Sequence, residues 1–182
     1  MSKKNGNWTI KDTKKIFEND FFKVYEDEVI QPDGKPGKYA TAHFVSGVSV
    51  LPIDDEDFVY LTKQFRYVAG QETLEVIAGA IENESPLEAA RRELKEEVGI
   101  SAGEVTELGT IQLDNSIIKN EVTFFIARRL TVGKPDRDAS EEMETVKITF
   151  HEAIEKVFSN EIKHSLSRAL LLEAWVKSGN VF

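Results

Sequence analysis

Residues 85–99 have the sequence Ser85-Pro86-Leu87-Glu88-Ala89-Ala90-Arg91-Arg92-Glu93-Leu94-Lys95-Glu96-Glu97-Val98-Gly99. Ser85 is a favourable N-cap, Pro86 suits the first helical position, and Glu88 completes a Ser-x-x-Glu capping box. Gly99 supplies a stop signal. Apolar side chains recur at helical spacing, at Leu87, Ala90, Leu94 and Val98. The sequence therefore predicts a helix that begins after Ser85, ends at Gly99 and buries one face.

The opposite face of this helix carries three carboxylates. Glu93, Glu96 and Glu97 are three and four positions apart, so their side chains project from adjoining positions. Like charges at this spacing destabilise an isolated helix by roughly a few tenths of a kcal/mol per pair, and the helix dipole disfavours anions in the C-terminal half. Taken alone, the cluster fits either a solvated charged face or a site for magnesium or manganese, which bind carboxylate oxygens together with substrate phosphates.

The wider segment Gly79 to Ile100 resembles the Nudix box, and its Arg-Glu-Leu-x-Glu-Glu-x-Gly-Ile core, residues 92–100, is intact. The resemblance implies that Arg92 holds the preceding loop through Glu84 and that Gly79 gives the backbone room to turn. One departure concerns this loop. Gly79 and Glu84 enclose four residues, whereas the box has five, so the loop is one residue short.

The same resemblance implies a metal site and its ligands. Glu93 and Glu97 would be the principal ligands, Glu96 would share a metal or orient its water, and the backbone carbonyl of Ala78 would complete the set. The expected cofactor is Mg²⁺, with Mn²⁺ as a possible substitute. Arg92 and the three glutamates are therefore the candidate catalytic residues of the box.

Outside the box the chain is similar to the branch of ADP-ribose pyrophosphatases and related nucleoside-diphosphate-sugar hydrolases. Gln64-Phe65-Arg66-Tyr67 resembles a Gln-Tyr-Arg segment whose arginine contacts substrate phosphate, although Arg66 alone would equally suit a surface. Leu74 to Gly79 resembles the Leu-Glu-x-Pro-Ala-Gly entry to the box, with Ile77 at the usual proline. The later stretch Asn115 to Glu121 stands where a Ser-Pro-Gly loop is expected, and only Glu121 matches. Arg66, Glu75 and Glu121 are expected to bind substrate. Sugar nucleotides other than ADP-ribose stay open as the substrate.

The resemblance implies a general base in a late loop. Residues 139–144 supply the candidates, with Glu141 ahead of Glu142 and Glu144 third. A mobile acidic loop is the alternative explanation for any one of them. The implied reaction is magnesium-dependent hydrolysis of the diphosphate bond of a nucleoside-diphosphate sugar, ADP-ribose or a related ADP- or GDP-sugar, to a nucleoside monophosphate and a sugar phosphate.

The rest of the chain predicts an α/β (or α+β) fold. Strands are expected at residues 21–25, 39–45, 47–53, 58–62, 105–113, 121–127 and 145–150. Two more helices are expected at residues 152–158 and 165–177, the second packing through Leu166, Leu170, Ala174 and Trp175. With the resemblance, this becomes a Nudix α/β/α sandwich with a mixed sheet. We expect an antiparallel N-terminal strand region over residues 1–45 and the Nudix domain over residues 46–182, together forming a single structural unit.

Composition excludes several other classes. The 182 residues suit one domain and include no cysteine, so disulfides and cysteine-ligated zinc are excluded. A net charge of −9 argues against nucleic-acid or anionic-membrane partners. No stretch reaches membrane-spanning length and the N-terminus lacks the apolar segment of a signal peptide, so a cytoplasmic protein is expected.

The resemblance also implies a homodimer in which N-terminal strands reach the partner's nucleotide pocket. The strand from Phe21 to Val29 suits that role, with Phe22 either stacking on the base or packing in the core. Two rival functions stay open. One is a Nudix hydrolase of dinucleoside polyphosphates or other nucleotides, against which the Gln-x-Arg segment counts. The other is a non-catalytic sugar-nucleotide sensor, against which the three intact box glutamates count.

Overall fold

The structure is a computed structural model that describes residues 2–137 and 142–179. The chain divides into two units. The N-terminal unit comprises Met1–Ser46 and Gln112–Glu121, and the larger unit comprises Gly47–Ile111 and Val122–Phe182. Residues 112–121 thus belong with the N-terminal strands, although they lie between two strands of the larger unit in the sequence.

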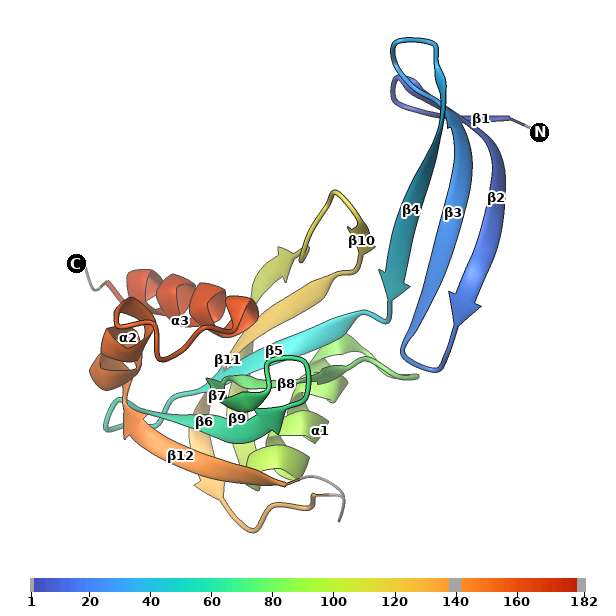
Figure 1. The fold of residues 1–182 in the computed structure, drawn as a ribbon. Coiled ribbons are helices and arrows are strands. Elements are labelled where there is room, and N and C mark those ends of the chain that lie inside the picture. The colour runs from blue at the N-terminus through green and yellow to red at the C-terminus, as the bar shows by residue number, and fades with distance from the viewer. Residues whose placement is uncertain (1, 138–141, 180–182) are drawn as a thin grey trace. The chain divides into compact units, whose positions relative to one another are not determined.

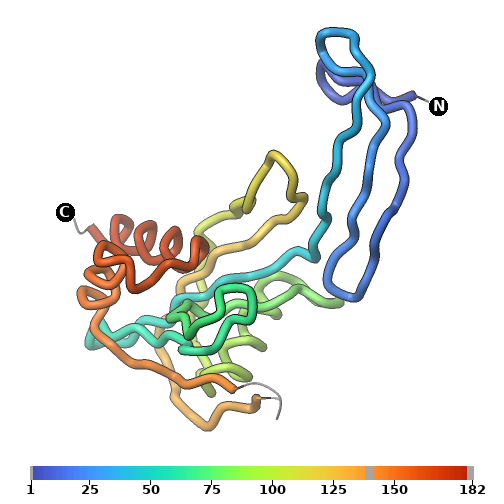
Figure 2. Tube along the Cα trace, in the orientation of Figure 1, coloured from blue at the N-terminus to red at the C-terminus, as the bar shows by residue number. Residues whose placement is uncertain are grey.

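The N-terminal unit is a five-stranded sheet in the order β1-β2-β3-β4-β10. Its strands are β1 (Lys3–Asn5), β2 (Trp8–Glu18), β3 (Phe22–Ile30), β4 (Pro36–Phe44) and β10 (Ile118–Lys119). The first four pair antiparallel, and Figure 2 traces β2, β3 and β4 as two successive hairpins. β10 pairs with β4 in parallel. Strand β2 was not predicted, because its residues are mostly exposed and polar and so lack an apolar alternation.

The described residues of the larger unit form two sheets. The first has the order β8-β5-β11-β9 and is mixed, since β11 runs parallel to β5 and the other pairs are antiparallel. Its strands are β5 (Gly47–Pro52), β8 (Ile77–Ala80), β9 (Ile100–Ile111) and β11 (Val122–Val132). The second sheet is antiparallel, in the order β12-β6-β7. Its strands are β6 (Phe58–Arg66), β7 (Gln71–Glu75) and β12 (Met143–Thr149).

Three helices cover the mixed sheet of the larger unit (Figure 1): α1 (Pro86–Val98), α2 (Phe150–Phe158) and α3 (Ser165–Lys177). Alternate residues of β5 point to opposite faces. Val48 and Val50 pack in the cluster that contains the buried face of α1, while Leu51 packs in the cluster that contains α2 and α3. The sheet therefore lies between α1 and the two C-terminal helices, which confirms the predicted α/β/α sandwich with a mixed sheet.

The predicted helix ends are confirmed for α1. The Ser85 Oγ accepts a hydrogen bond from the Glu88 N–H at 3.3 Å, and Glu88 Oε2 accepts one from the Ser85 N–H at 2.8 Å. Gly99 ends the helix in the left-handed region, at φ 69°. One predicted core residue is wrong. Leu87 is 42% exposed, and Ala89 is buried instead because it shares the inward face with Ala90.

The predicted bounds of α3 are confirmed. All four of its expected core residues pack in the cluster that contains α2 and α3. Strand β6 extends beyond the predicted Thr62 to Arg66, and β7 pairs with this extension. Over the described residues, no helix is both long and apolar enough to cross a membrane.

Candidate active site

Two glutamates of α1 are buried although each carries a carboxylate. Glu93 and Glu97 are both 8% exposed and lie one helical turn apart, whereas the Glu96 side chain is 41% exposed. The helix is held in place by its capping box at one end and by the packing of Leu94 and Val98 on the sheet. The fold therefore keeps two carboxylates out of water side by side, which an isolated helix would disfavour.

Arg92 joins the loop before α1 to these carboxylates. Its Nε and NH2 donate to Glu84 Oε1 at 2.9 and 2.8 Å, and NH2 also donates to the Ala80 carbonyl at 2.9 Å. Its NH1 donates to Glu93 Oε1 at 2.8 Å and to Glu96 Oε2 at 3.0 Å. The hydrogen bonds to Glu84, together with those to Glu96 and Glu93, raise the pKa of Arg92 despite partial burial. The predicted Arg92–Glu84 contact is confirmed, so the loop of four intervening residues still brings Glu84 to Arg92.

Gly79 leaves space for the carboxylate of Glu93. A Cβ atom at position 79 would lie 1.8 Å from Glu93 Oε1 and 2.0 Å from its Cδ. The φ of Gly79 is outside the left-handed region, since the positive-φ glycines are others. The glycine is therefore required by the close approach of the Glu93 side chain, and not by a left-handed backbone conformation.

Arg66 and Glu75 form a second polar group on the β6–β7 hairpin. Arg66 Nε donates to Glu75 Oε1 at 3.0 Å and Arg66 NH2 donates to Glu75 Oε2 at 2.7 Å, which is a bidentate pair. Glu75 is 2% exposed, while the Arg66 side chain is 45% exposed. Burial tends to raise the pKa of Glu75, but hydrogen bonds from Arg66 and Thr73 and the nearby positive charge outweigh it, so this pKa is lowered.

The Arg66–Glu75 pair lies within electrostatic reach of the first polar group, which consists of Arg92, Glu84, Glu93, Glu96 and Glu97. The pKa of Arg66 is raised, first by its hydrogen bonds to Glu75 and also by the charge of Glu97. The charge of Arg66 and that of a box carboxylate therefore act on the same space. A site with this composition suits a ligand that brings both anionic oxygens for a guanidinium and a cation for the carboxylates.

Comparison with known proteins identifies the family. Residues 43–169 match the NUDIX domain. The chain belongs to the Nudix family. Residues 8–41 match a second family, the nucleoside diphosphate sugar hydrolase N-terminal domain.

Relatives of this Nudix chain include an ADP-ribose pyrophosphatase and a GDP-mannose pyrophosphatase. It is 30% identical to the ADP-ribose pyrophosphatase of Bacillus subtilis (strain 168), over 82% of each chain. It is 32% identical to the GDP-mannose pyrophosphatase of Salmonella typhimurium (strain LT2), over 62% of this chain and 64% of the relative. The crystal structure of an ADP compounds hydrolase superposes with a TM-score of 0.83, covering 98% of this chain and 99% of the other. At 21% identity that last likeness shows the fold alone.

Nudix hydrolases use divalent metal ions, and the side chains present fit one by charge and donor type. The two polar groups contain five carboxylates and two guanidinium groups, which are Glu75, Glu84, Glu93, Glu96, Glu97, Arg66 and Arg92. This surplus of buried or half-buried negative charge favours the binding of a cation. Within residues 2–137 and 142–179, no three His, Asp or Glu side chains converge on one point. Arg92 NH1 donates to both Glu93 and Glu96.

Arg137 is a site residue that the sequence did not predict. Its Nε donates to the Glu97 carbonyl at 2.7 Å, its NH2 donates to Thr145 Oγ1 at 2.6 Å, and its NH1 donates to the Met143 carbonyl. It thus ties the C-terminal end of α1 to the start of β12, where a cation also suits the helix dipole. A single arginine in a polar stretch has no spacing that would have predicted this contact.

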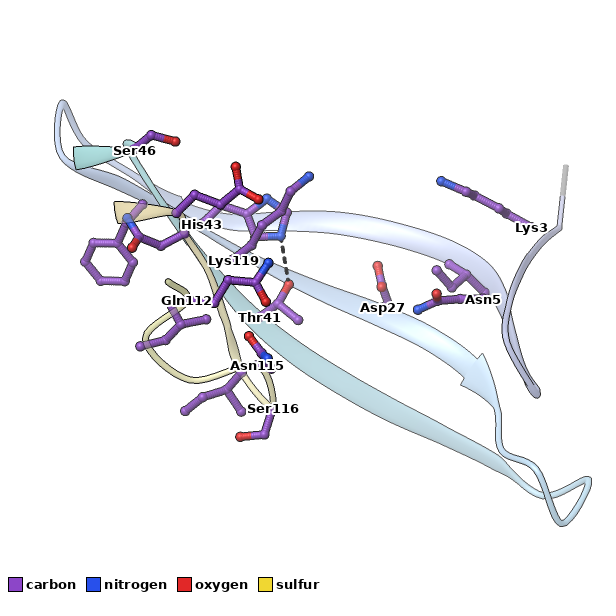
Figure 3. A pocket seen from close by; sticks show the side chains of 16 residues that line it. Lys3, Asn5, Asp27, Thr41, His43, Ser46, Gln112, Asn115, Ser116 and Lys119 are labelled. Atoms are coloured by element: carbon purple, nitrogen blue, oxygen red, sulfur yellow. Dashed lines mark hydrogen bonds between the residues drawn. The ribbon is translucent and has the colours of Figure 1, made fainter. Parts of the chain in front are cut away.

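The other predicted site residues lie on several elements of the two units. Ala78 lies in β8, next to Gly79, while Glu142 and Glu144 are both exposed, Glu144 in β12 opposite Lys63. Glu141 lies outside the described residues. Glu121 belongs to the N-terminal unit, where it lines a pocket of about 860 Å³. Figure 3 shows that pocket between β4 and residues 112–121, with His43, Thr41, Asn115 and Lys119 among its labelled side chains.

Proposed function

We propose that this Nudix protein hydrolyses the diphosphate bond of a nucleoside-diphosphate sugar, with Mg²⁺ as the metal ion. The observation that carries the proposal is the Arg92 network, which holds Glu84, Glu93 and Glu96 around one guanidinium beside the buried Glu97. The match of residues 8–41 to the nucleoside diphosphate sugar hydrolase N-terminal domain supports the substrate class. The products would be a nucleoside monophosphate and a sugar phosphate.

Each part of the site has a proposed task. Glu93 and Glu97 would hold the metal, with Glu96 and the Ala78 carbonyl as further ligands. A bound divalent ion would neutralise diphosphate charge and acidify a water molecule. Arg92 would keep the loop and its glutamates in place. Arg66 would grip a phosphate through the edge of its guanidinium that Glu75 does not occupy.

The general base is proposed to be a carboxylate near the start of β12. Glu141 and Glu142 are the first candidates, and Glu142 is exposed. Arg137 supports this placement, because it binds both the end of α1 at Glu97 and the first residue of β12, Met143. A base attached there would be carried close to the carboxylate helix. Glu141→Gln and Glu142→Gln, assayed separately, distinguish the two candidates by loss of turnover at unchanged KM.

We also propose that the N-terminal sheet forms a homodimer contact. The rings of Phe17, Phe22 and Phe44 stack across β2, β3 and β4, with centroids 5.3 and 5.0 Å apart. Phe17 and Phe44 are 48% and 40% exposed, and Phe21, which precedes Phe22 in the sequence, is 75% exposed. An aromatic surface of this kind suits a protein interface. Phe22 packs within the ladder, which favours the packing role over base stacking. Sedimentation of the active protein as a stable monomer would contradict the dimer.

The test of the proposed function is phosphate release coupled to alkaline phosphatase, with Mg²⁺ and with Glu97→Gln as the matched inactive variant. The panel contains ADP-ribose, ADP-glucose, GDP-mannose, UDP-glucose and diadenosine polyphosphates. Activity on sugar nucleotides that disappears in Glu97→Gln is the expected result. Activity confined to diadenosine polyphosphates would replace the substrate class, and silence with both Mg²⁺ and Mn²⁺ would favour the sensor function.

A further inference from the structure

The Arg66–Glu75 pair is connected to the N-terminus of α3. His164 is the N-cap of that helix, but its side chain makes no capping hydrogen bond. Its Nδ1 lies 2.8 Å from Ser167 Oγ and 3.4 Å from Glu75 Oε2. Ser167 is fully buried, and its Oγ accepts a hydrogen bond from the Val76 N–H at 3.0 Å. The first turn of α3 therefore contacts both Glu75 and the backbone that follows it.

Histidine at this N-cap is a poor choice for helix stability. Serine, aspartate or asparagine would satisfy a free N–H and stabilise the helix by about 1 kcal/mol. The His164 side chain instead faces Glu75, the carboxylate that orients Arg66. A residue that gives up a local stabilising contact for one with a buried polar group is a candidate for a role in the site.

The His164 imidazole bridges α3 and Glu75. Its Nδ1 lies 2.8 Å from the Ser167 hydroxyl of α3 and 3.4 Å from Glu75 Oε2, so the ring packs against the carboxylate from the side of the helix. Burial lowers the pKa of His164, and the positive charge of Arg66 lowers it further. The negative charge of Glu75 acts in the opposite direction, but the net effect is a lowered pKa. Glu75 is then surrounded by Arg66, by the Thr73 hydroxyl at 2.6 Å and by the imidazole. Its carboxylate has little freedom to rotate.

Arg66 needs such support because of its place in the chain. It is the last residue of β6, paired with Gln71 across the turn that follows. Tyr67 and Val68 in that turn are 91% and 99% exposed, so neighbouring residues hold the hairpin end only weakly. The bidentate pair fixes the Nε and NH2 edge of the guanidinium and leaves NH1 outside the pair. The direction of Arg66 is therefore set by Glu75, and that of Glu75 by Thr73 and α3.

We propose that His164 and Ser167 are positioning residues that hold Glu75, and through it Arg66, in the orientation that grips the substrate diphosphate. The inference rests on the proposed function and adds two residues of the C-terminal helix to its site. It places them behind the phosphate-binding arginine, without contact to substrate.

The test is steady-state kinetics with the sugar nucleotide that the wild-type protein hydrolyses fastest. His164→Ala is expected to raise KM and to lower kcat/KM by roughly 10-fold, since a misdirected guanidinium loses productive contacts. His164→Asn keeps an amide N–H near the place of Nδ1 and is expected to recover most of this loss. His151→Ala, at a histidine whose side chain is 70% exposed on α2, is the matched control and should leave both constants unchanged.

A double-mutant cycle distinguishes positioning from general damage. In an Arg66→Ala background, adding His164→Ala is expected to change kcat/KM by less than about 2-fold, because its effect passes through Arg66. A full additive loss in that background, or a wild-type kcat/KM in His164→Ala, would overturn the inference while leaving the proposed function in place. A wild-type protein that hydrolyses no sugar nucleotide would overturn the proposed function, and the inference with it.

Discussion

The carboxylate of Glu93 occupies the space that a side chain at Gly79 would fill. A Cβ atom there would come within 2.6 Å of both carboxylate oxygens and of the carbon that joins them. The backbone of β8 at Gly79 and the Glu93 carboxylate, a proposed metal ligand, are thus packed in direct contact, so their positions are set together.

Gly79→Ala is expected to displace the Glu93 side chain and to reduce kcat by at least about 10-fold, since small misplacements at a reacting centre are costly. Rates at saturating substrate and Mg²⁺ measure the effect. Gly103→Ala is the control, because a Cβ there meets the Arg129 side chain at 3.1 Å, away from the site. Full activity in Gly79→Ala would show that Glu93 can move without loss.

Arg92→Lys is expected to lower the free energy of unfolding by about 1–3 kcal/mol and to abolish turnover. A single ammonium cannot bond Glu84, the Ala80 carbonyl, Glu93 and Glu96 together, as the guanidinium does. Urea unfolding and phosphate release measure the two effects. Arg91→Lys on the same helix is the comparison, since Arg91 makes a single bond to the Ala102 carbonyl at 2.6 Å. Equal effects of both changes would contradict a special role for Arg92.

Stability is expected to fall in acid through Glu75. Its pKa is lowered in the folded state from an ordinary value of 4.5, so its stabilising contribution is present above that pH. The contribution is lost as the pH falls from 4.5 towards the folded-state value. Glu75→Gln should therefore be less stable than wild type by about 2 kcal/mol at neutral pH, with a difference that shrinks in acid. Urea unfolding at a series of pH values measures this, and a constant difference would argue against the assignment.

Mg²⁺ is expected to raise the Tm of the wild-type protein and to leave that of Glu97→Gln nearly unchanged. A ligand that binds only the folded state at 100 times its Kd adds about 2.7 kcal/mol. Thermal unfolding with EDTA and with increasing Mg²⁺ provides the measurement, and Glu152→Gln on α2 controls for non-specific screening. An equal rise in Tm for the wild-type protein and for Glu97→Gln would show that the ion binds at another site.

Local signals predicted the parts of the site that depend on neighbours in the sequence. The capping box, Gly99 and the spacing of the three glutamates predicted α1 and its carboxylate face before any tertiary contact was known. The Arg92–Glu84 contact followed from the resemblance to the Nudix box. By contrast, the contacts of Arg137 with Glu97 and of His164 with Glu75 join residues at least 40 positions apart, and neither has a spacing signal. Strand β2 escaped prediction because most of its residues are exposed and polar, without an apolar alternation.

The parallel pairing of β10 with β4 has a consequence for synthesis on the ribosome. Ala42 leaves the exit tunnel early, but its partner Ile118 follows only after β5 to β9 and the whole of α1 have been made. The β4 edge of the N-terminal sheet therefore stays unpaired while much of the larger unit is synthesised. The sheet cannot be completed as an independent early folding step. A gene fragment that ends near residue 45 would encode a sheet with an open edge, which is a known route to aggregation.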